Sequence, residues 1–153
     1  MIPVAALEKA GMHADPPEGF APHFRKSPVT DPWEPLYSRR LDGTVQIGVR
    51  VREVHCNSRG LLHGGVVAAL ADNAMGLSCG ATLPSVQGLV TVSLSVDYAG
   101  SARAGQWLQI APRVLKTGRS MGFADAVVTA DGDIIARASA TFRIMSTPVK
   151  PDR

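Results

Sequence analysis

The chain contains several stretches in which hydrophobic and polar residues alternate, and one long stretch that is apolar nearly throughout. Alternation with a period of two is typical of β-strands with one buried face. It is clearest at residues 90–98, where Val90, Val92, Leu94, Val96 and Tyr98 share one face and Thr91, Ser93, Ser95 and Asp97 share the other. Similar runs occupy residues 36–51, 106–116, 120–130 and 134–144. They predict a hairpin before the apolar stretch and about four antiparallel strands after it.

Residues 64–81 form the apolar stretch, and we predict that they are a helix. Apolar side chains occur around nearly the whole circumference of this helix, so it must be buried on most sides. The pattern therefore favours an α+β fold in which a curved antiparallel sheet wraps around one long central helix. Because one sheet face cannot cover such a helix completely, we expect a dimer that buries the rest.

Two further features of the pattern support this arrangement. Asp42-Gly43 is a strong signal for a hairpin turn, and residues 131–133 are a second turn signal between strands. Alternate positions from Ile134 to Ile144 are mostly alanines. Small side chains in a row would allow the helix to approach this strand closely.

The chain divides into three parts, which are residues 1–35, 36–145 and 146–153. In the first part we expect a short helix at 2–10 and an ordered or semi-ordered, Pro-rich lead-in at 12–35 that lacks regular secondary structure. The apolar side chains of Phe20, Phe24 and Trp33 are expected to anchor this segment. It would cap a pocket or extend a dimer interface, and the residues do not decide between these roles. The second part is the domain proper, and the last is expected to be a disordered tail.

The composition is that of an ordinary globular protein of 153 residues, with 45% hydrophobic and 19% charged residues. There is no run of about 18 apolar residues that would span a membrane, and the first residues do not resemble a signal peptide. Two cysteines are too few for a disulfide framework, so a cytoplasmic protein is expected. The net charge of +3 lacks the clustered basic and aromatic residues of a nucleic-acid-binding protein. Neither nucleic acid nor a membrane is therefore expected as a partner.

One acidic residue, Asp72, interrupts the apolar helix, and no Lys or Arg lies within one helical turn of it. Burying an unpaired carboxylate costs several kcal/mol, and acids in such positions often mark functional sites. The alternative is that Asp72 points into a solvated groove, or forms a hydrogen bond with Asn73 or a partner chain.

The helix opens with His63-Gly64-Gly65. Glycines leave the backbone N–H groups unobstructed at the end of the helix where its dipole is positive, and such groups can stabilise the oxyanion of acyl transfer. Close packing at the helix entrance would explain the two glycines equally well. Gly64 and Asp72 are eight residues apart, or about 12 Å along a helix, so one helix cannot bring both to the same carbonyl group. Two antiparallel helices of a dimer could, which predicts composite active sites.

Asn57, His63-Gly64-Gly65 and Asp72 form the pattern N-x5-HGG-x6-D, which is followed by the polar strand VTVSLSVDY. This combination resembles hotdog-fold acyl-CoA thioesterases of the PaaI-like (phenylacetate-degradation) type, over residues 36–145. The resemblance implies hydrolysis of an acyl-CoA thioester to a free acid and coenzyme A. It also implies a homodimer or a dimer of dimers (a homotetramer). No metal or other cofactor is expected, because coenzyme A enters as part of the substrate.

The resemblance also implies roles for individual residues. The Gly64 N–H would polarise the thioester carbonyl, and Asn57 would bind the thioester or the attacking water. Asp72 of the partner subunit would act as general base or nucleophile. Thr91 matches a position where a Ser of some relatives positions the water. His63 is a further candidate for the general base, with a structural role or a ligand contact as the alternative.

Substrate contacts are expected within the helix and in the basic segments that follow it along the chain. No Lys or Arg lies between Arg59 and Arg103, and in relatives a basic, glycine-containing turn meets the phosphates or adenosine of coenzyme A. The candidate contacts are Gly65, Met75, Arg103, Lys116, Gly118, Arg119 and Ser120. A solvated basic turn would explain residues 116–120 equally well. Aromatic and medium-chain acyl groups are both compatible with the sequence.

Two other functions stay open. A hotdog dehydratase or hydratase would pair a His with an acid in D-x-N-x-x-H or H-x5-P-G patterns, and neither pattern occurs. A non-catalytic acyl-CoA-binding module would keep the fold without turnover. The complete set of Asn57, Gly64 and Asp72 argues against such a module.

Overall fold

The computed structural model describes residues 3, 15–85 and 88–145. The predicted helix at 2–10, except for residue 3, and the predicted tail at 146–153 lie outside this part. The elements in chain order are β1 (Ala21–Pro22), the 3-10 helix η1 (Asp31–Trp33), β2 (Tyr37–Leu41), β3 (Thr44–Arg50), the 3-10 helix η2 (Glu53–His55), α2 (Gly64–Ala81), β4 (Leu89–Tyr98), β5 (Trp107–Thr117), β6 (Met121–Ala130) and β7 (Asp133–Ile144).

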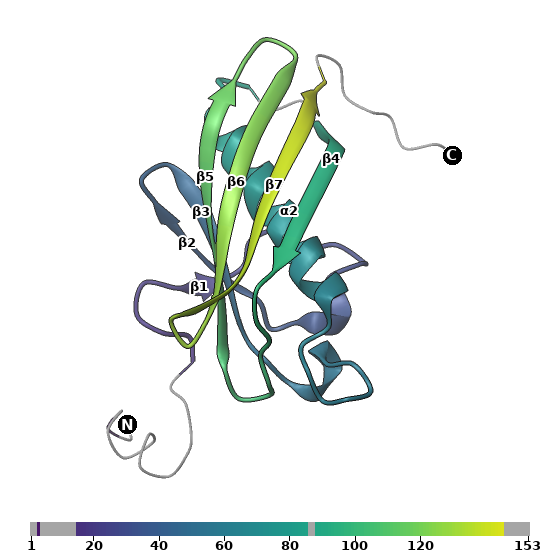
Figure 1. Ribbon diagram of the computed structural model, residues 1–153. Helices are drawn as coiled ribbons and strands as arrows, with labels where there is room; N and C mark the ends of the chain where they lie inside the picture. Colours follow the sequence, from purple (N-terminus) through teal and green to yellow (C-terminus); the bar gives the residue numbers. More distant parts are fainter. Residues whose placement is uncertain (1–2, 4–14, 86–87, 146–153) are drawn as a thin grey trace.

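The strands form one antiparallel sheet in the order β1-β2-β3-β5-β6-β7-β4. Helix α2 lies along one face of this sheet and contacts every strand from β3 to β7 (Figure 1). The predicted α+β architecture, with a hairpin, one long helix and four further antiparallel strands, is confirmed. In the described part of the chain no helix is long and apolar enough to cross a membrane.

The two turn signals have the backbone geometry that they predict. Asp42 and Gly43 have φ angles of 51° and 76°, and Asp131 and Gly132 have φ angles of 48° and 88°. Positive φ at both central residues is the geometry of a type I′ turn, whose twist matches that of the flanking strands. Each Asp-Gly pair therefore closes a hairpin, the first between β2 and β3 and the second between β6 and β7.

The helix packs on the small side chains of β7. The buried alanines of this strand are Ala136, Ala138 and Ala140. The prediction that Ile134 shares their face is wrong. The pairing with β6 passes from Ala136 to Ile134 and leaves out Ile135, and such a bulge reverses the alternation of side chains. Ile135 is consequently 6% exposed, whereas Ile134 is 64% exposed.

A second bulge corrects the predicted alternation of β4. Thr91 pairs with Phe142 of β7, and the next pair joins Ser93 to Thr141, so Val92 is left out. Directly opposed residues of antiparallel strands point to the same side, and Phe142 is buried on the helix side. The bulge therefore turns Thr91 toward α2. Uniform alternation would instead have placed Thr91 on the face opposite to Tyr98, which pairs with the buried Ala136, and so away from the helix.

The Pro-rich lead-in is described by the structure from residue 15 onward and is anchored at one edge of the sheet. The expectation that this segment lacks regular secondary structure is wrong, because it contains η1 and the short strand β1, which pairs with β2. Phe20 is buried edge-on against Trp107 with 5.3 Å between ring centroids. Trp33 is half-buried. Phe24 does not act as a buried anchor, because its side chain is 53% exposed. It lies instead on the wall of a cavity beside α2.

Candidate active site

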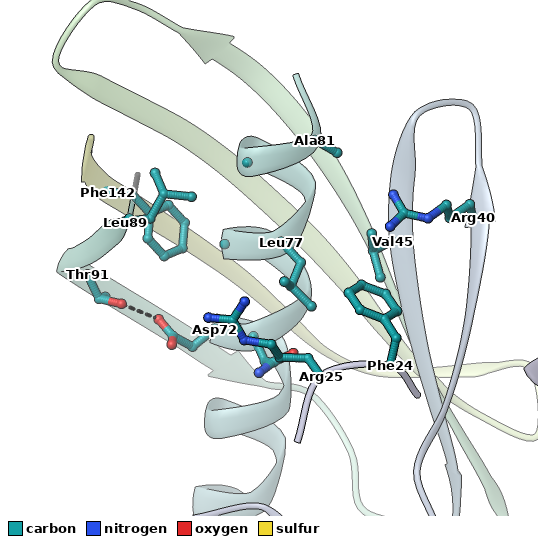
Figure 2. A pocket seen from close by; sticks show the side chains of 14 residues that line it. Phe24, Arg25, Arg40, Val45, Asp72, Leu77, Ala81, Leu89, Thr91 and Phe142 are labelled. Atoms are coloured by element: carbon teal, nitrogen blue, oxygen red, sulfur yellow. Dashed lines mark hydrogen bonds between the residues drawn. The ribbon is translucent and has the colours of Figure 1, made fainter. Parts of the chain in front are cut away.

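The carboxylate of Asp72 faces a cavity on the side of α2 and receives a hydrogen bond from β4. The Thr91 hydroxyl donates to Asp72 Oδ1 over 2.7 Å (Figure 2). Asp72 is half-buried. Of the two possibilities that the sequence left open, its carboxylate therefore points into a groove and is not buried without a partner. Because the bulge at Val92 turns Thr91 toward the helix, the contact depends on an irregularity of an edge strand.

The cavity follows α2 from Asp72 toward the end of the helix and has a volume of about 390 Å³. Its helix wall is the strip Asp72, Asn73, Gly76, Leu77, Gly80 and Ala81. Nine residues of rise from Asp72 to Ala81 correspond to about 13 Å. Other elements complete the wall with Phe24, Arg25, Arg40, Val45, Gly88, Leu89, Thr91 and Phe142. The Asp72–Thr91 pair therefore lies on the wall of an elongated, mostly apolar cavity.

The start of α2 is built around His63. His63 is the N-cap residue, and its Nδ1 accepts the Gly65 N–H over 2.8 Å. The Gly65 N–H is therefore occupied, whereas the Gly64 N–H has no acceptor among the described residues. This geometry is consistent with a structural role for the His63 ring and leaves the Gly64 N–H available to a ligand.

Tyr98 joins this first turn of α2 to the end of β4. Its hydroxyl donates to the Gly64 carbonyl oxygen, and burial raises the pKa of the Tyr98 phenol. A β-carbon at position 64 would lie 3.1 Å from Tyr98 Cζ. Glycine therefore lets β4 approach the start of the helix, which is the packing role considered for it, without occupying its N–H.

Asn57 organises the loop that leads into α2. Its side-chain oxygen accepts the N–H groups of Arg59 and Leu61 over 2.9 and 3.2 Å. This is the local side-chain-to-backbone bonding typical of Asn in turns. The side-chain NH₂ group keeps its donors, so a substrate contact from Asn57 would be made by nitrogen.

Within one chain, the predicted basic substrate contacts lie at opposite ends of helix α2. Lys116, Gly118, Arg119 and Ser120 lie at the β5–β6 turn, which the Thr82–Thr117 hydroxyl contact of 2.8 Å ties to the end of α2. Arg103 instead bridges to Leu61 beside the start of α2. A single chain thus brings Asp72 and Thr91 together but separates the basic turn from Arg103.

Met75 does not line the cavity. Its side chain is fully buried in the core, so Met75 lies outside the helix strip at 72, 73, 76, 77, 80 and 81 that faces the cavity. Its neighbour Leu77, two positions further along, does line the cavity.

Residues of the lead-in complete the site, and the sequence did not single them out as site residues. Phe24 and Arg25 line the cavity. His23 is buried, and its Nε2 lies 3.2 Å from Asn73 Oδ1, next to Asp72. Burial lowers the pKa of the His23 imidazole, and the Asn73 hydrogen bond only partly opposes this effect. The available signal was the short run of His, aromatic and basic residues at 23–25, which no periodicity explains.

Across residues 15–85 and 88–145, no group of three or more His, Cys, Asp or Glu side chains is placed to hold a metal ion. Both ring nitrogens of the buried His55 are engaged by the backbone, at the Arg52 N–H and the Trp33 carbonyl oxygen.

Comparison with known proteins gives a family for this geometry. Residues 59–136 match the family model described as the thioesterase superfamily. The Pseudomonas aeruginosa protein PA0474, for which an esterase activity is inferred, is 38% identical over 129 residues, 84% of this chain and 96% of that protein. Human acyl-coenzyme A thioesterase 13 is 34% identical over 101 residues, 65% of this chain and 71% of that protein.

Solved structures share the fold. The Streptococcus mutans protein smu.793, solved with acetyl-CoA, matches 83% of this chain and 98% of its own with a TM-score of 0.70 and 25% identity. The E. coli PaaI protein of the phenylacetic acid degradation operon matches 75% of this chain and 83% of its own with a TM-score of 0.67 and 19% identity. The predicted hotdog fold and the resemblance to PaaI-like proteins are confirmed. The chain therefore belongs to the thioesterase superfamily.

Proposed function

We propose that the protein hydrolyses acyl-CoA thioesters, with Asp72 as the reacting acid. The observation that carries the proposal is the Asp72 carboxylate, held by Thr91 on the wall of the cavity, in a chain of the thioesterase superfamily. Acyl-coenzyme A thioesterase 13 and the acetyl-CoA complex of smu.793 support acyl-CoA as the substrate class.

Thr91 leaves one carboxylate oxygen of Asp72 available for chemistry. Thr91 donates to Oδ1, so Oδ2 is the oxygen that would meet the water or the thioester. As general base, Asp72 takes a proton from water while the water oxygen bonds to the carbonyl carbon. As nucleophile, Oδ2 bonds to that carbon directly, and water hydrolyses the resulting anhydride. In both routes the C–S bond breaks, its electron pair goes to sulfur, and the products are the free acid and coenzyme A.

The carbonyl oxygen needs a donor that Asp72 cannot supply. The Gly64 N–H at the start of α2 is a suitable oxyanion donor. It lies about 12 Å along the helix from Asp72 in the same chain. A composite site would solve this problem, with Gly64 of the partner subunit facing Asp72.

The edge strand β4 supports such a dimer. It is the last strand of the sheet and exposes Val90, Val92 and Leu94, a combination that favours pairing with another edge. Tyr98 contacts Gly64 at one level of the helix, and Thr91 contacts Asp72 at another. Antiparallel pairing of two β4 strands about an axis near Leu94 would bring the partner's Gly64 opposite Asp72.

The test is release of coenzyme A thiol from short, medium, long and aromatic acyl-CoAs. Turnover of at least one of them is expected. A folded protein that binds acyl-CoA without releasing thiol would contradict the proposal and favour the non-catalytic binding module. Hydration or dehydration of an enoyl- or hydroxyacyl-CoA in place of thiol release would favour the dehydratase or hydratase.

A further inference from the structure

A side-chain amide next to the proposed reacting acid is held from outside the helix. Asn73 follows Asp72 on α2 and lines the same cavity. His23 Nε2 lies 3.2 Å from Asn73 Oδ1, and the His23 N–H donates to the Leu36 carbonyl oxygen over 2.9 Å. In Figure 2, Arg25 of the same segment lies beside Asp72. The lead-in therefore reaches the end of the cavity at which thioester hydrolysis is proposed.

The protonation of the His23 ring determines the direction of its hydrogen bond to Asn73. The His23 side chain is buried, and its Nδ1 has no hydrogen-bond partner in the described part of the chain. Burial lowers the pKa of the imidazole, so near neutral pH the ring carries one proton. A proton on Nδ1 would be a buried donor without an acceptor, which folded proteins rarely contain. The proton therefore lies on Nε2, which donates to Asn73 Oδ1.

This direction leaves the other half of the Asn73 amide available. A side-chain amide has an oxygen that accepts hydrogen bonds and an NH₂ group that donates two. The oxygen is engaged by His23, and among residues 15–85 and 88–145 the NH₂ group has no acceptor within hydrogen-bond distance. Because Asn73 is half-buried on the cavity wall, this donor is available to a ligand in the cavity.

Asp72 and Asn73 border the same space from consecutive positions of the helix. Consecutive residues are about 100° apart around a helix axis and do not face each other, so the two side chains can flank a ligand group. In both proposed routes, the carbonyl carbon lies at the Asp72 end of the cavity, and negative charge develops on its oxygen. Side-chain amides of Asn are among the donors that stabilise such an oxyanion.

We propose that Asn73 donates a hydrogen bond to a carbonyl oxygen of the acyl-CoA beside Asp72, and that His23 is the positioning residue that orients the Asn73 amide. This inference rests on the proposed function, because it uses the same cavity and the same substrate class. The thioester carbonyl would then have two donors, Asn73 and Gly64 of the partner subunit. The first amide carbonyl of the pantetheine arm is the other acceptor with the same chemistry.

The test measures thiol release from the best acyl-CoA of the panel. Asn73→Ala should lower kcat/KM about tenfold or more. His23→Leu keeps the amide but removes the donor that orients it, so a loss of about threefold is expected. His23→Gln can still donate to Asn73 Oδ1 and should stay within about twofold of the wild type. Gln109→Ala removes another half-buried amide, which does not line the cavity, and serves as the matched control with no effect expected.

The pattern of losses separates a substrate contact from a purely structural one. Asn73→Ala and His23→Leu remove the same hydrogen bond within the protein, and urea unfolding shows whether each variant is folded. If this bond only holds the lead-in against α2, the two variants lose the same activity, and that result would overturn the proposal. Unchanged activity of Asn73→Ala would overturn it as well.

The S-ethyl thioester of the same acid identifies the carbonyl that Asn73 binds, because it lacks the pantetheine arm. A loss in kcat of Asn73→Ala that persists with this substrate would assign the hydrogen bond to the thioester carbonyl. A rise in KM confined to the acyl-CoA would assign it to the pantetheine amide. No thiol release from any acyl-CoA by the wild type would instead overturn the proposed function, on which this inference rests.

Discussion

At the scale of the residue, the site depends on one hydrogen bond between a strand and a helix. Thr91 orients the Asp72 carboxylate by donating to Oδ1 over 2.7 Å. A fixed carboxylate reacts from one oxygen and in one direction, which lowers the cost of reaching the reactive geometry. In the proposed mechanism, the hydroxyl of Thr91 would therefore contribute to the rate by positioning Asp72.

Substitution of Thr91 tests this contribution. Thr91→Val keeps the shape of the side chain and removes the donor, so kcat should fall about tenfold while KM changes little. Thr91→Ser keeps the hydroxyl and should retain most of kcat. Steady-state kinetics on the best acyl-CoA of the panel measures both variants. Equal kcat values for the Val and Ser variants would show that the hydroxyl does not orient Asp72.

A glycine in β3 illustrates how single residues determine packing. A β-carbon at Gly48 would overlap the ring of Trp107, which also packs against Phe20 of the lead-in. Gly48→Ala should therefore lower the free energy of unfolding by about 1–3 kcal/mol. Gly118→Ala is the control, since a β-carbon there would find its nearest atom at 3.6 Å. Urea unfolding compares the two, and equal stabilities would contradict this account of Trp107 packing.

At the scale of the element, the lead-in is joined to α2 through a buried histidine. His23 Nε2 lies 3.2 Å from Asn73 Oδ1, and its Nδ1 is buried with no partner in the described structure. Burial lowers the pKa of the folded His23 below its usual value of about 6.5. Between the lowered pKa and about 6.5, the unfolded chain binds a proton that the folded chain does not. The stability that the neutral, buried His23 contributes is thus complete above about pH 6.5 and declines as the pH falls through this window.

This linkage predicts a pH-dependent difference between two proteins. His23→Gln keeps a donor for Asn73 and cannot be protonated. Between about pH 7.5 and about pH 5.5, the wild type should lose more free energy of unfolding than the variant. Urea unfolding at the two pH values measures both losses. An identical pH dependence would show that His23 does not titrate differently in the folded and unfolded chains.

The elements also show which features the sequence could predict. Alternation and Asp-Gly pairs are local signals, and they predicted strands β2 to β7, the central helix and both hairpin turns, but not the short strand β1. The bulges at Val92 and Ile135 depend on pairing with another strand, which no local pattern contains. The contacts of Phe24 and Arg25 with the cavity were missed for a related reason, because a Pro-rich segment has no periodicity that would show which residues face the domain.

At the scale of the whole molecule, the proposed active site needs two chains. The predicted roles of Gly64 and Asp72 can meet at one carbonyl only across a dimer. The same antiparallel arrangement would bring the basic β5–β6 turn of one chain toward Arg103 of the other. Within a single chain these residues lie at opposite ends of helix α2. In the dimer, the turn of one chain and Arg103 of the other could contact the same coenzyme A.

Mixed dimers test the composite site. Asp72→Asn removes the acid, and Gly64→Pro removes the N–H at a helix position that accepts proline. Each variant alone should be inactive. A mixed dimer has one site with both native groups, so random mixing should restore about a quarter of the wild-type activity. Folding of Gly64→Pro is checked by circular dichroism, and the failure of mixed folded variants to regain activity would contradict a composite site.

The central claim is that Asp72 carries thioester hydrolysis, and the direct test replaces its carboxylate with an amide. Asp72→Asn and the control Asp97→Asn, an exposed acid of β4 that pairs with Arg137, are compared with the wild type in thiol release from acyl-CoA. The account predicts a loss of at least about a hundredfold in kcat for Asp72→Asn and near wild-type turnover for Asp97→Asn. Near wild-type turnover by a folded Asp72→Asn protein would contradict it.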